Sequence, residues 1–458
     1  MSVLDSKNRG SFSSKLGFVL SAAGASVGLG NIWRFPYLAA RYGGGAFLLV
    51  YIILALTFGY TMIIAETSIG RSCRKSPVGA FDYYGKNSFM KAGGWLNAII
   101  PVLIVPYYSV VGGWVCKYLY EFICGDMNQL VGDNYFSDFI SGGWQAELWF
   151  VIFIAFVLGV IWLGVNNGIE RVSGIMMPVL VVLALIISIY TITRPGAMDG
   201  VKYLLVPDFS RFSWKTVVAA MGQMFYSLSI AMGILITFGS YMKKDTSIDH
   251  STIQVEIFDT AIALLGGLMI IPAVFAFFKG NPDTLNQGPA LMFITMPRIF
   301  ADMAGGRLIG ILFFLLVLFA AVTSAIALCE SAVSTFSDEF GWSRRKGTAV
   351  MAVIMMVLGT LSCLGYGPLS SVSVMGMAFL DFFDFLTNSL MMPVAAVFIC
   401  LLVSRHMGIQ AVEDEVMADG HPFGRRKLFS FMIQYICPVF AIVIFLSSIA
   451  SALGWINI

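Results

Sequence analysis

Residues 21–37 read SAAGASVGLGNIWRFPY, and this stretch decides the fold. It lies in an apolar segment, residues 12–40, that is long enough to cross a bilayer. Three glycines within seven residues, Gly24, Gly28 and Gly30, weaken a helix at a depth where lipid supplies no water for freed backbone groups. Unwound backbone in this segment must therefore face protein or a cavity.

Close packing against another helix is the alternative explanation, because Gly24 and Gly28 form a small-x-x-x-small pattern. Packing does not account for Asn31 and Arg34, which follow directly. Together with freed carbonyls, Ser26 and Asn31 provide uncharged oxygens of the kind that bind a hard, singly charged cation. The stretch therefore predicts a binding site inside the membrane.

The composition is that of a polytopic membrane protein, since 58% of the 458 residues are hydrophobic and only 12% are charged. Seven cysteines without regular spacing indicate neither a zinc site nor a disulfide framework. We expect no cleavable signal peptide, because the first apolar stretch has no cleavage motif. An enzyme is not indicated, because the three histidines, His250, His406 and His421, all fall in predicted cytoplasmic loops.

A hydropathy window of about 20 residues predicts eleven membrane-spanning helices within a single domain, residues 1–458. Placing the N-terminus in the cytoplasm puts most of the 28 Lys and Arg residues on the inner side, as the positive-inside rule favours. Eleven spans then put the C-terminus outside, in a multi-pass protein of the cell membrane. The predicted spans are residues 13–40, 45–70, 89–123, 147–164, 168–192, 214–241, 253–278, 306–336, 347–366, 372–404 and 427–455.

The sixth span is the second irregular one, because Ser227, Ser229 and Gly233 interrupt its middle. Hydrogen bonding to the carbonyl four residues back is the alternative explanation of the two serines. Interrupted spans that stand five apart are the pattern of inverted repeats that meet at the membrane midplane. The predicted repeats are residues 9–192 and 213–404, followed by an eleventh helix at 427–455.

Two motifs resemble the opening signature of the neurotransmitter:sodium symporter family: GLGNIWRFPY at residues 28–37 and GGGAF at residues 43–47. The resemblance runs from about Arg9 to the end of the tenth span and is strongest to bacterial amino-acid members. It implies an all-α membrane protein of the LeuT type, with an inverted five-plus-five repeat and broken helices 1 and 6. A binding site at the midplane is an established property of that fold. We expect sodium ions, a substrate and the lipid bilayer as partners, and no nucleic acid.

The resemblance implies two sodium sites. The first takes the Ser26 carbonyl, the side chains of Asn31 and Ser227, a polar group of helix 7 and the substrate carboxylate. Because sodium and substrate then complete each other's site, each raises the other's affinity by the same factor. The second site takes the carbonyls of Gly24, Val27 and Ala320 and the hydroxyls of Thr323 and Ser324. Hydrogen bonding within the helix is the alternative explanation of these two hydroxyls.

Asp259 in helix 7 departs from the family pattern. A carboxylate in an apolar span is a functional hypothesis by default. The family usually has Asn near this point, but Asp259 stands seven residues before Gly266 where the usual spacing is eight, so direct sodium ligation stays open. In either case its negative charge balances sodium and makes chloride unnecessary. The alternative is a structural Asp at the cytoplasmic start of helix 7.

Gly28 indicates an amino-acid substrate, because monoamine carriers of the family have Asp at this position to meet the ligand amine. The resemblance places the substrate carboxylate on the first sodium, the amides of Leu29 and Gly30 and the Tyr108 hydroxyl. It places these uncharged residues around the substrate side chain: Val27, Ile104, Tyr226, Ser229, Met232, Gly233, Ser324 and Leu328. The implied function is import of neutral hydrophobic L-amino acids, aromatic ones included, with two sodium ions and without chloride.

Gates are implied at both ends of the pathway. On the outer side Arg34 pairs with Asp384, or with Asp381 one turn away, and on the inner side Arg9 pairs with Asp338, with Tyr241 nearby. Tyr226 caps the substrate, and Glu66 of helix 2 bonds the unwound backbone of helix 6.

Gly168 and Pro178 match the Gly-x9-Pro pattern of the family in helix 5. Because Pro178 removes a backbone donor, we expect the start of helix 5 to unwind and open a water path to the second sodium site. A static proline kink is the alternative. The alternative function is a proton-coupled amino-acid transporter of the same fold, which normally replaces the second sodium with Lys or Arg in helix 5 or 8. No basic residue stands near Thr323 in helix 8.

Overall fold

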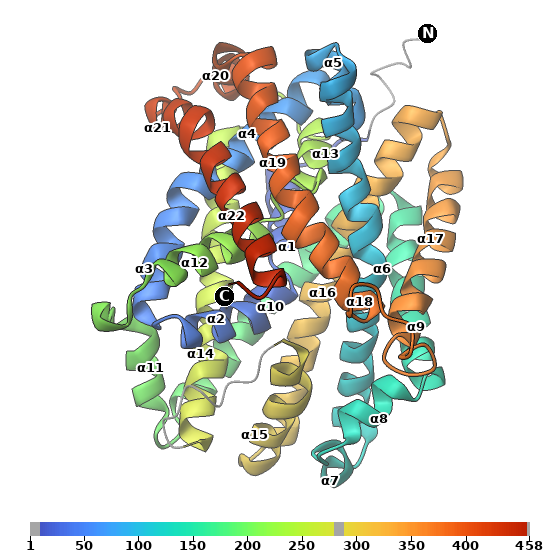
Figure 1. Cartoon of the computed structure of the whole chain (residues 1–458), viewed down its shortest axis with the longest axis vertical. Helices are drawn as coiled ribbons and strands as arrows, with labels where there is room; N and C mark the ends of the chain where they lie inside the picture. Colours follow the sequence, from blue (N-terminus) through green and yellow to red (C-terminus); the bar gives the residue numbers. More distant parts are fainter. Residues whose placement is uncertain (1–9, 279–287, 456–458) are drawn as a thin grey trace.

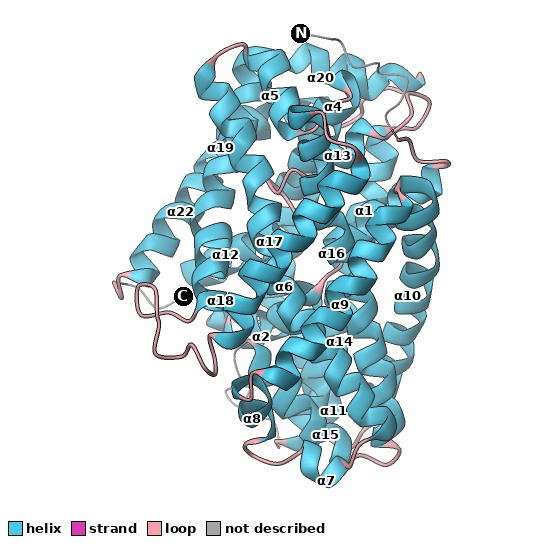
Figure 2. Ribbon diagram, turned by 90° about the vertical axis from the view of Figure 1, so that its right-hand side faces the viewer, coloured by secondary structure: helices cyan, strands magenta, loops and turns pink. Residues whose placement is uncertain are grey.

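The computed structural model describes residues 10–278 and 288–455, and within these ranges the chain is helical and contains no β-strand (Figure 2). Nine helices in these ranges are long and apolar enough to cross a membrane. They are α3 (Gly45–Leu54) continuing into α4 (Tyr60–Cys73), α6 (Ser88–Cys124), α9 (Trp144–Leu163), Val165–Ile192 ending in α10 (Arg171–Ile192), α14 (Ile248–Phe277), α16 (Gly306–Phe340), α17 (Arg344–Leu364), α18 (Phe379–Asp384) continuing through α19 (Met392–Leu401) to Met407, and α21 (Arg426–Phe431) continuing into α22 (Cys437–Ala452).

These nine helices coincide with nine of the eleven predicted spans, and the remaining two, the first and the sixth, are each divided into two short helices. The prediction of an all-helical membrane protein interrupted at these two spans is confirmed. The total of eleven crossings and the division into two repeats stay predictions.

Helix 1 breaks where the glycines predicted. Its first half, α1 (Lys15–Ser26), ends at Val27, whose backbone is extended with φ −72° and ψ 98°. The chain resumes as a π-helical turn, Gly30–Arg34, followed by α2 (Phe35–Arg41), and the two halves differ in direction by 54°. The break leaves backbone carbonyls and amides around Gly28 outside any regular helical ladder.

Helix 6 breaks between α12 (Trp214–Ser227) and α13 (Ile234–Ser240). Three residues in the break have left-handed backbone: Ser229 with φ 53°, Ala231 with φ 59° and Gly233 with φ 70°. Two of them carry a side chain, so this backbone persists only because surrounding groups hold it. Glu66 of α4 does so directly, because its Oε1 accepts a 2.7 Å hydrogen bond from the Ala231 amide, as predicted.

The short helices gather at two ends of the molecule (Figure 1). At one end lie α5 (Pro77–Gly85) and α20 (Ile409–Val416), and at the other lie α7 (Met127–Leu130), α8 (Tyr135–Ser141), α11 (Ala197–Leu205) and α15 (Met296–Asp302). Buried Arg71 links α4 to α20 through a 2.7 Å ion pair with Glu415. Lys244 also pairs with Glu415, at 2.6 Å, so these two basic residues of the predicted inner side lie together, while the orientation in the cell stays a prediction.

The broken helices lie inside a layer of unbroken ones. α1 packs against α10, α14 and α16, while α12 packs against α3 and α13 packs against α4. α16 in turn lies along α6. Both irregular segments are thus shielded from lipid by continuous helices, the arrangement that unwound backbone requires at this depth.

Replacing Glu66 tests how the helix 6 break is held. Glu66→Ala leaves the buried Ala231 amide without an acceptor, which costs about 1–3 kcal/mol of folding free energy. Glu66→Gln keeps a carbonyl oxygen at the same place, so we expect a clearly smaller loss. Thermal unfolding of the purified protein in detergent measures both, and equal melting temperatures for the two variants would contradict this role of Glu66.

Candidate functional site

A cluster of buried oxygen-bearing side chains lies where the helix 1 break meets α12 and α14. The side-chain nitrogen of Asn31, Nδ2, donates to Asp259 Oδ1 at 2.8 Å and to Ser227 Oγ at 3.0 Å. Ser227 Oγ donates to Asp259 Oδ1 at 2.8 Å, and the Tyr51 hydroxyl donates to Asp259 Oδ2 at 2.8 Å. All four side chains are buried, so a single carboxylate holds three donors out of contact with water.

Asp259 sits well inside α14, not at its start, so the alternative of a structural Asp at the beginning of helix 7 is wrong. The within-helix alternative is also wrong for both serines of helix 6. Ser227 bonds Asp259, and Ser229 Oγ donates across to the Ala25 carbonyl at 2.9 Å. Ser26 adjoins this cluster, with its hydroxyl 3.5 Å from the Leu228 carbonyl.

A second oxygen cluster lies between α1 and α16. Ser324 Oγ is 3.2 Å from the Gly24 carbonyl, 3.3 Å from the Ala25 carbonyl and 3.3 Å from the Val27 carbonyl. Thr323 bonds within its own helix, to the Phe319 carbonyl at 2.9 Å and the Ala320 carbonyl at 3.3 Å. A Cβ on Gly24 would lie 3.1 Å from Thr323 Cβ. The groups predicted for the second sodium site are therefore neighbours: the carbonyls of Gly24, Val27 and Ala320 and the hydroxyls of Thr323 and Ser324. The donors are uncharged oxygens, which fit a hard monovalent cation.

A small cavity of about 30 Å³ lies between the two clusters. No lining side chain is charged, and the lining residues are Ala25, Ser26, Gly28, Leu29, Gly30, Asn31, Ile104, Tyr108, Tyr226, Ser227, Ser229, Met232, Ser324 and Leu328. Two residues predicted to line it do not. Val27 contributes its carbonyl to the second cluster, and Gly233 faces Pro77, where a Cβ would lie 2.7 Å from the ring. Gly233 thus allows close packing at the start of α13 and does not enlarge the cavity.

Glycine is required at two positions of the cavity wall. A Cβ on Gly28 would lie 2.9 Å from Ser324 Oγ and 3.1 Å from the Tyr108 hydroxyl. A Cβ on Gly30 would lie 2.7 Å from the Tyr226 ring. These contacts bring bare backbone to the cavity, and the Leu29 amide already lies 3.3 Å from the Tyr108 hydroxyl.

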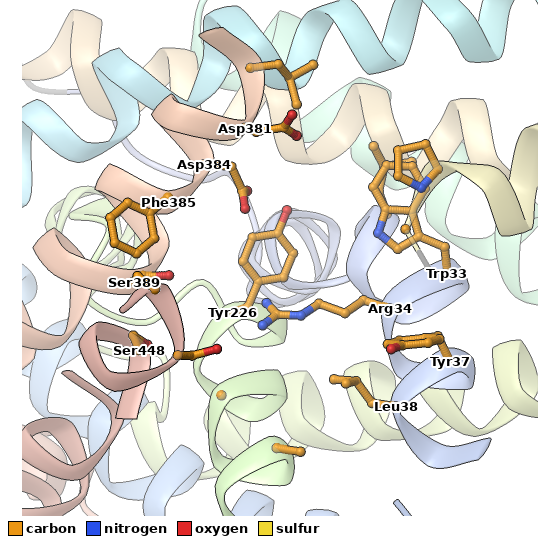
Figure 3. Close-up of a pocket in the computed structure, with 18 of the residues that line it drawn as sticks. Trp33, Arg34, Tyr37, Leu38, Tyr226, Asp381, Asp384, Phe385, Ser389 and Ser448 are labelled. Atoms are coloured by element: carbon orange, nitrogen blue, oxygen red, sulfur yellow. The ribbon is translucent and has the colours of Figure 1, made fainter. Parts of the chain in front are cut away.

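A wider vestibule of about 580 Å³ opens on the other side of Tyr226. Figure 3 shows Arg34 extending from one wall and Asp384 from the opposite wall, with Tyr226 between them. The Arg34 guanidinium lies 5.2 Å from the Tyr226 ring centroid, and in the described part of the chain Arg34 forms no ion pair with Asp384 or Asp381. Asp384 instead accepts a 2.6 Å hydrogen bond from Asn388, and Asp381 accepts one from Tyr366 at 3.2 Å.

The residues predicted to form the inner gate make polar contacts with other helices. The Tyr241 hydroxyl donates to Glu330 Oε1 at 2.7 Å, and Arg344 pairs with Glu330 at 2.6 Å. Asp338 accepts a 2.7 Å hydrogen bond from the Ser76 amide. Arg9, the predicted partner of Asp338, lies outside the described residues.

Helix 5 is continuous in this conformation. A π-helical turn, Val165–Glu170, leads into α10, which contains Pro178. Gly168 lets this turn approach α9, since a Cβ there would lie 2.2 Å from the Val160 carbonyl. Unwinding of this segment stays a prediction.

Sequence reasoning missed three residues of the site. Tyr51 binds Asp259, Gln223 donates to the Gly30 carbonyl at 3.1 Å, and Glu256 is a buried carboxyl with no hydrogen-bond partner among the described residues. Gln223 and Glu256 carry the signal that singled out Asp259, a polar group in an apolar span. Tyr51 could not be found in this way, because a tyrosine in a membrane helix most often only packs against its neighbours.

Two interrupted helices around a buried cavity, with oxygen clusters on either side of it, are the arrangement of a secondary transporter with broken helices. The chain belongs to the sodium:neurotransmitter symporter family, whose family model matches residues 9–138 and 136–454. This result confirms the family resemblance. A protein of this family is a membrane transporter and not an enzyme.

Individual relatives agree over nearly the whole chain. An uncharacterized sodium-dependent transporter of Bacillus subtilis, YhdH, is 33% identical over 96% of this chain and 97% of that protein. An uncharacterized sodium-dependent transporter of Haemophilus influenzae is 30% identical over 97% of this chain and 99% of that protein. The crystal structure of MhsT in complex with L-phenylalanine matches with a TM-score of 0.86 and 34% identity, covering 96% of this chain and 100% of that one. The LeuT-type fold is thereby confirmed.

Asp259→Ala tests whether the carboxylate organises the first cluster. The change leaves the donors of Asn31, Tyr51 and Ser227 without their common acceptor, at about 1–3 kcal/mol for each buried donor that stays unpaired. Asp259→Asn keeps one acceptor oxygen and should cost less. We expect the melting temperature in potassium buffer to fall in the order wild type, Asn, Ala. An Ala variant as stable as wild type would show that the cluster does not depend on this carboxylate.

Proposed function

We propose that this chain is a sodium-coupled symporter of neutral hydrophobic L-amino acids, aromatic ones included, that works by alternating access. The proposal includes two sodium ions per substrate and no requirement for chloride. It rests on one observation: an uncharged cavity, bounded by bare helix 1 backbone, lies between two clusters of oxygen ligands.

The first cluster supports a sodium site that also touches substrate. Ser26, Asn31 and Ser227 line the same cavity, and Asp259 lies behind them. A substrate carboxylate in that cavity reaches the Leu29 and Gly30 backbone and the Tyr108 hydroxyl, and it completes the ion's ligand shell. Sodium and substrate then strengthen each other's binding equally, which is the thermodynamic basis of coupled transport.

The second cluster supports a sodium site that does not touch substrate. Its ligands are the carbonyls of Gly24, Val27 and Ala320 and the hydroxyls of Thr323 and Ser324. Because α1 and α16 each supply part of the set, an ion at this point binds best when the two helices are together. Sodium therefore favours one arrangement of α1 against α16, as alternating access requires.

The substrate class follows from the lining. No side chain on the cavity wall is charged, so a basic or acidic side chain of a substrate would be left unpaired. Met232 adapts its shape to different apolar groups. The relative MhsT was crystallised with L-phenylalanine, which supports an aromatic amino acid as substrate here.

Asp259 supports the independence from chloride. Its carboxylate already accepts hydrogen bonds from Tyr51, Asn31 and Ser227, so a negative charge is in place beside the first sodium site. An additional anion beside that carboxylate would be repelled.

Import is supported by the form of the pathway. The vestibule is open on the side of Arg34 and Asp384, while Glu330, Arg344 and Tyr241 close the other end. With the basic loops in the cytoplasm, the open side faces outward. Substrate then enters past Tyr226 and leaves after the gates exchange roles.

Proton coupling is the second candidate, and Glu256 is the observation in its favour. Both of its carboxylate oxygens are buried without a hydrogen-bond partner among the described residues, and an unpaired carboxyl inside a membrane span is typical of proton relays in transporters. The surroundings of Gly24 in the second cluster argue against proton coupling. The side chains nearest to Gly24 are Thr323 and Met177, and neither is the Lys or Arg that would replace the second sodium ion.

Uptake into liposomes that contain the purified protein tests the proposal. We expect L-phenylalanine and L-leucine to accumulate with an inward sodium gradient, and not when potassium or choline replaces sodium. Replacement of chloride by gluconate should leave the rate unchanged, and L-lysine and L-glutamate should not compete. Uptake that persists without sodium and follows a proton gradient would contradict the proposal and favour the second candidate.

Ser324→Ala tests the second sodium site separately. Loss of one hydroxyl ligand should raise the sodium concentration for half-maximal L-phenylalanine binding about 10- to 100-fold, the usual effect of damaging a metal site. Ser331→Ala is the matched control, because Ser331 is also a buried serine of α16 but bonds Thr237. Equal sodium dependence of the two variants would contradict the placement of the site.

A further inference from the structure

Helix 5 and α1 lie side by side, and two of their contacts involve a glycine of α1. A Cβ on Gly17 would lie 1.8 Å from Glu170 Oε1, and a Cβ on Gly24 would lie 3.4 Å from Met177 Sδ. Gly17 and Gly24 are seven residues apart, as are Glu170 and Met177. Both helices therefore advance by about two turns between the contacts, so they run in the same direction and in register.

At the first contact a carboxylate of helix 5 holds the backbone in front of α1. The Ser13 amide donates to Glu170 Oε2 at 2.8 Å, and the Ser13 hydroxyl donates to Oε1. The Ser14 hydroxyl lies 3.3 Å from Oε1. Glu170 is only 9% exposed, so these charge-assisted bonds are shielded from water.

The Glu170 contact is not needed to cap α1. Ser14 already does so, because its hydroxyl accepts a 2.9 Å hydrogen bond from the Gly17 amide. Capping normally comes from the residue next to the helix, and it satisfies α1 without help from helix 5. What Glu170 adds is a link between two helices.

The second contact lies at the second oxygen cluster. Met177 packs against Gly24, whose carbonyl is 3.2 Å from Ser324 Oγ, so α10 forms one wall of that cluster. The π-helical turn Val165–Glu170 ends at the first contact, and α10 runs from there to the second contact, with Ser173 buried and open space beside Gly174. The start of helix 5 is thus held to α1 on both sides of residues 171–176, and the π-helical turn lies directly before the first contact.

We propose that Glu170 is a positioning residue that clasps the start of helix 5 to the start of α1, and that release of this clasp lets helix 5 open the second sodium site. That an ion occupies this site rests on the proposed function. The clasp itself rests on the contacts of Glu170 alone.

Hydrogen exchange of peptides that cover residues 160–178 tests the clasp in the purified full-length protein. Glu170→Ala should speed exchange of this segment about tenfold or more in both sodium and potassium, the effect of losing one charge-assisted hydrogen bond. Glu170→Gln, which keeps one acceptor oxygen, should lie between Ala and wild type. Arg171→Gln is the matched control, because Arg171 is the next residue and its side chain is exposed.

Gly17→Ala provides a second test that leaves Glu170 in place. The added methyl group displaces the Glu170 carboxylate. Gly17→Ala by itself should therefore speed hydrogen exchange of residues 160–178 as much as Glu170→Ala does. The double variant should exchange no faster than Glu170→Ala, because both changes break one contact. Peptides from α6 and α16 report whether each variant is folded. Independent, additive effects of the two changes, or exchange in Glu170→Ala equal to that in Arg171→Gln, would overturn the proposal.

The same experiment separates the clasp from the proposed function. Slower exchange of residues 160–178 in sodium than in potassium is expected of the wild type if an ion closes the second site. If sodium has no effect in any variant while Glu170→Ala still speeds exchange, the clasp stands and the sodium site fails. If sodium slows exchange while Glu170→Ala has no effect, the sodium site stands and the clasp is wrong.

Discussion

The structure depends on one constraint: backbone that unwinds inside a membrane must have its polar groups satisfied by protein, because no water is available. Glu66 accepts from the Ala231 amide, Gln223 donates to the Gly30 carbonyl and Ser229 donates to the Ala25 carbonyl. These bonds hold both breaks open at defined positions. Other backbone oxygens near the helix 1 break, such as the Gly24 and Val27 carbonyls, face Ser324 of α16.

The same constraint ties the freed backbone of α1 to a neighbouring helix. A carbonyl freed by the break at Val27 bonds Ser324 of another helix, so the position of α1 and the ligand set of the second cluster depend on each other. The cavity wall itself is uncharged, and the Asp259 carboxylate lies behind it, against Asn31 and Ser227. Negative charge therefore lies on one side of the cavity only. Helix 5 runs along α1 and is the outer wall of this arrangement.

Much of this organisation could be predicted from the sequence, because breaks in membrane helices are conspicuous. Three glycines before Asn31 and two serines before Gly233 interrupt otherwise apolar spans, and the structure breaks at both places. The position of Asp259 could be predicted only as a buried acid. Its partners Asn31 and Ser227 come from helices far apart in the sequence, so only the folded chain shows that it accepts their hydrogen bonds.

Other features were beyond sequence reasoning for physical reasons. Tyr51 resembles the aromatic residues that fill any membrane core, and Gly233 resembles a residue that provides space when in fact it packs against Pro77. The pairing of Glu170 with Gly17 depends on the relative position of two helices, which periodicity within either one does not encode.

The central claim is that the two breaks together bind alkali ions beside a zwitterion, and equilibrium binding of radioactive sodium tests it most directly. We predict two sodium ions per chain at saturation when L-phenylalanine is present, and tighter sodium binding with L-phenylalanine than without it. No saturable sodium binding, or sodium binding that L-phenylalanine leaves unchanged, would contradict the account.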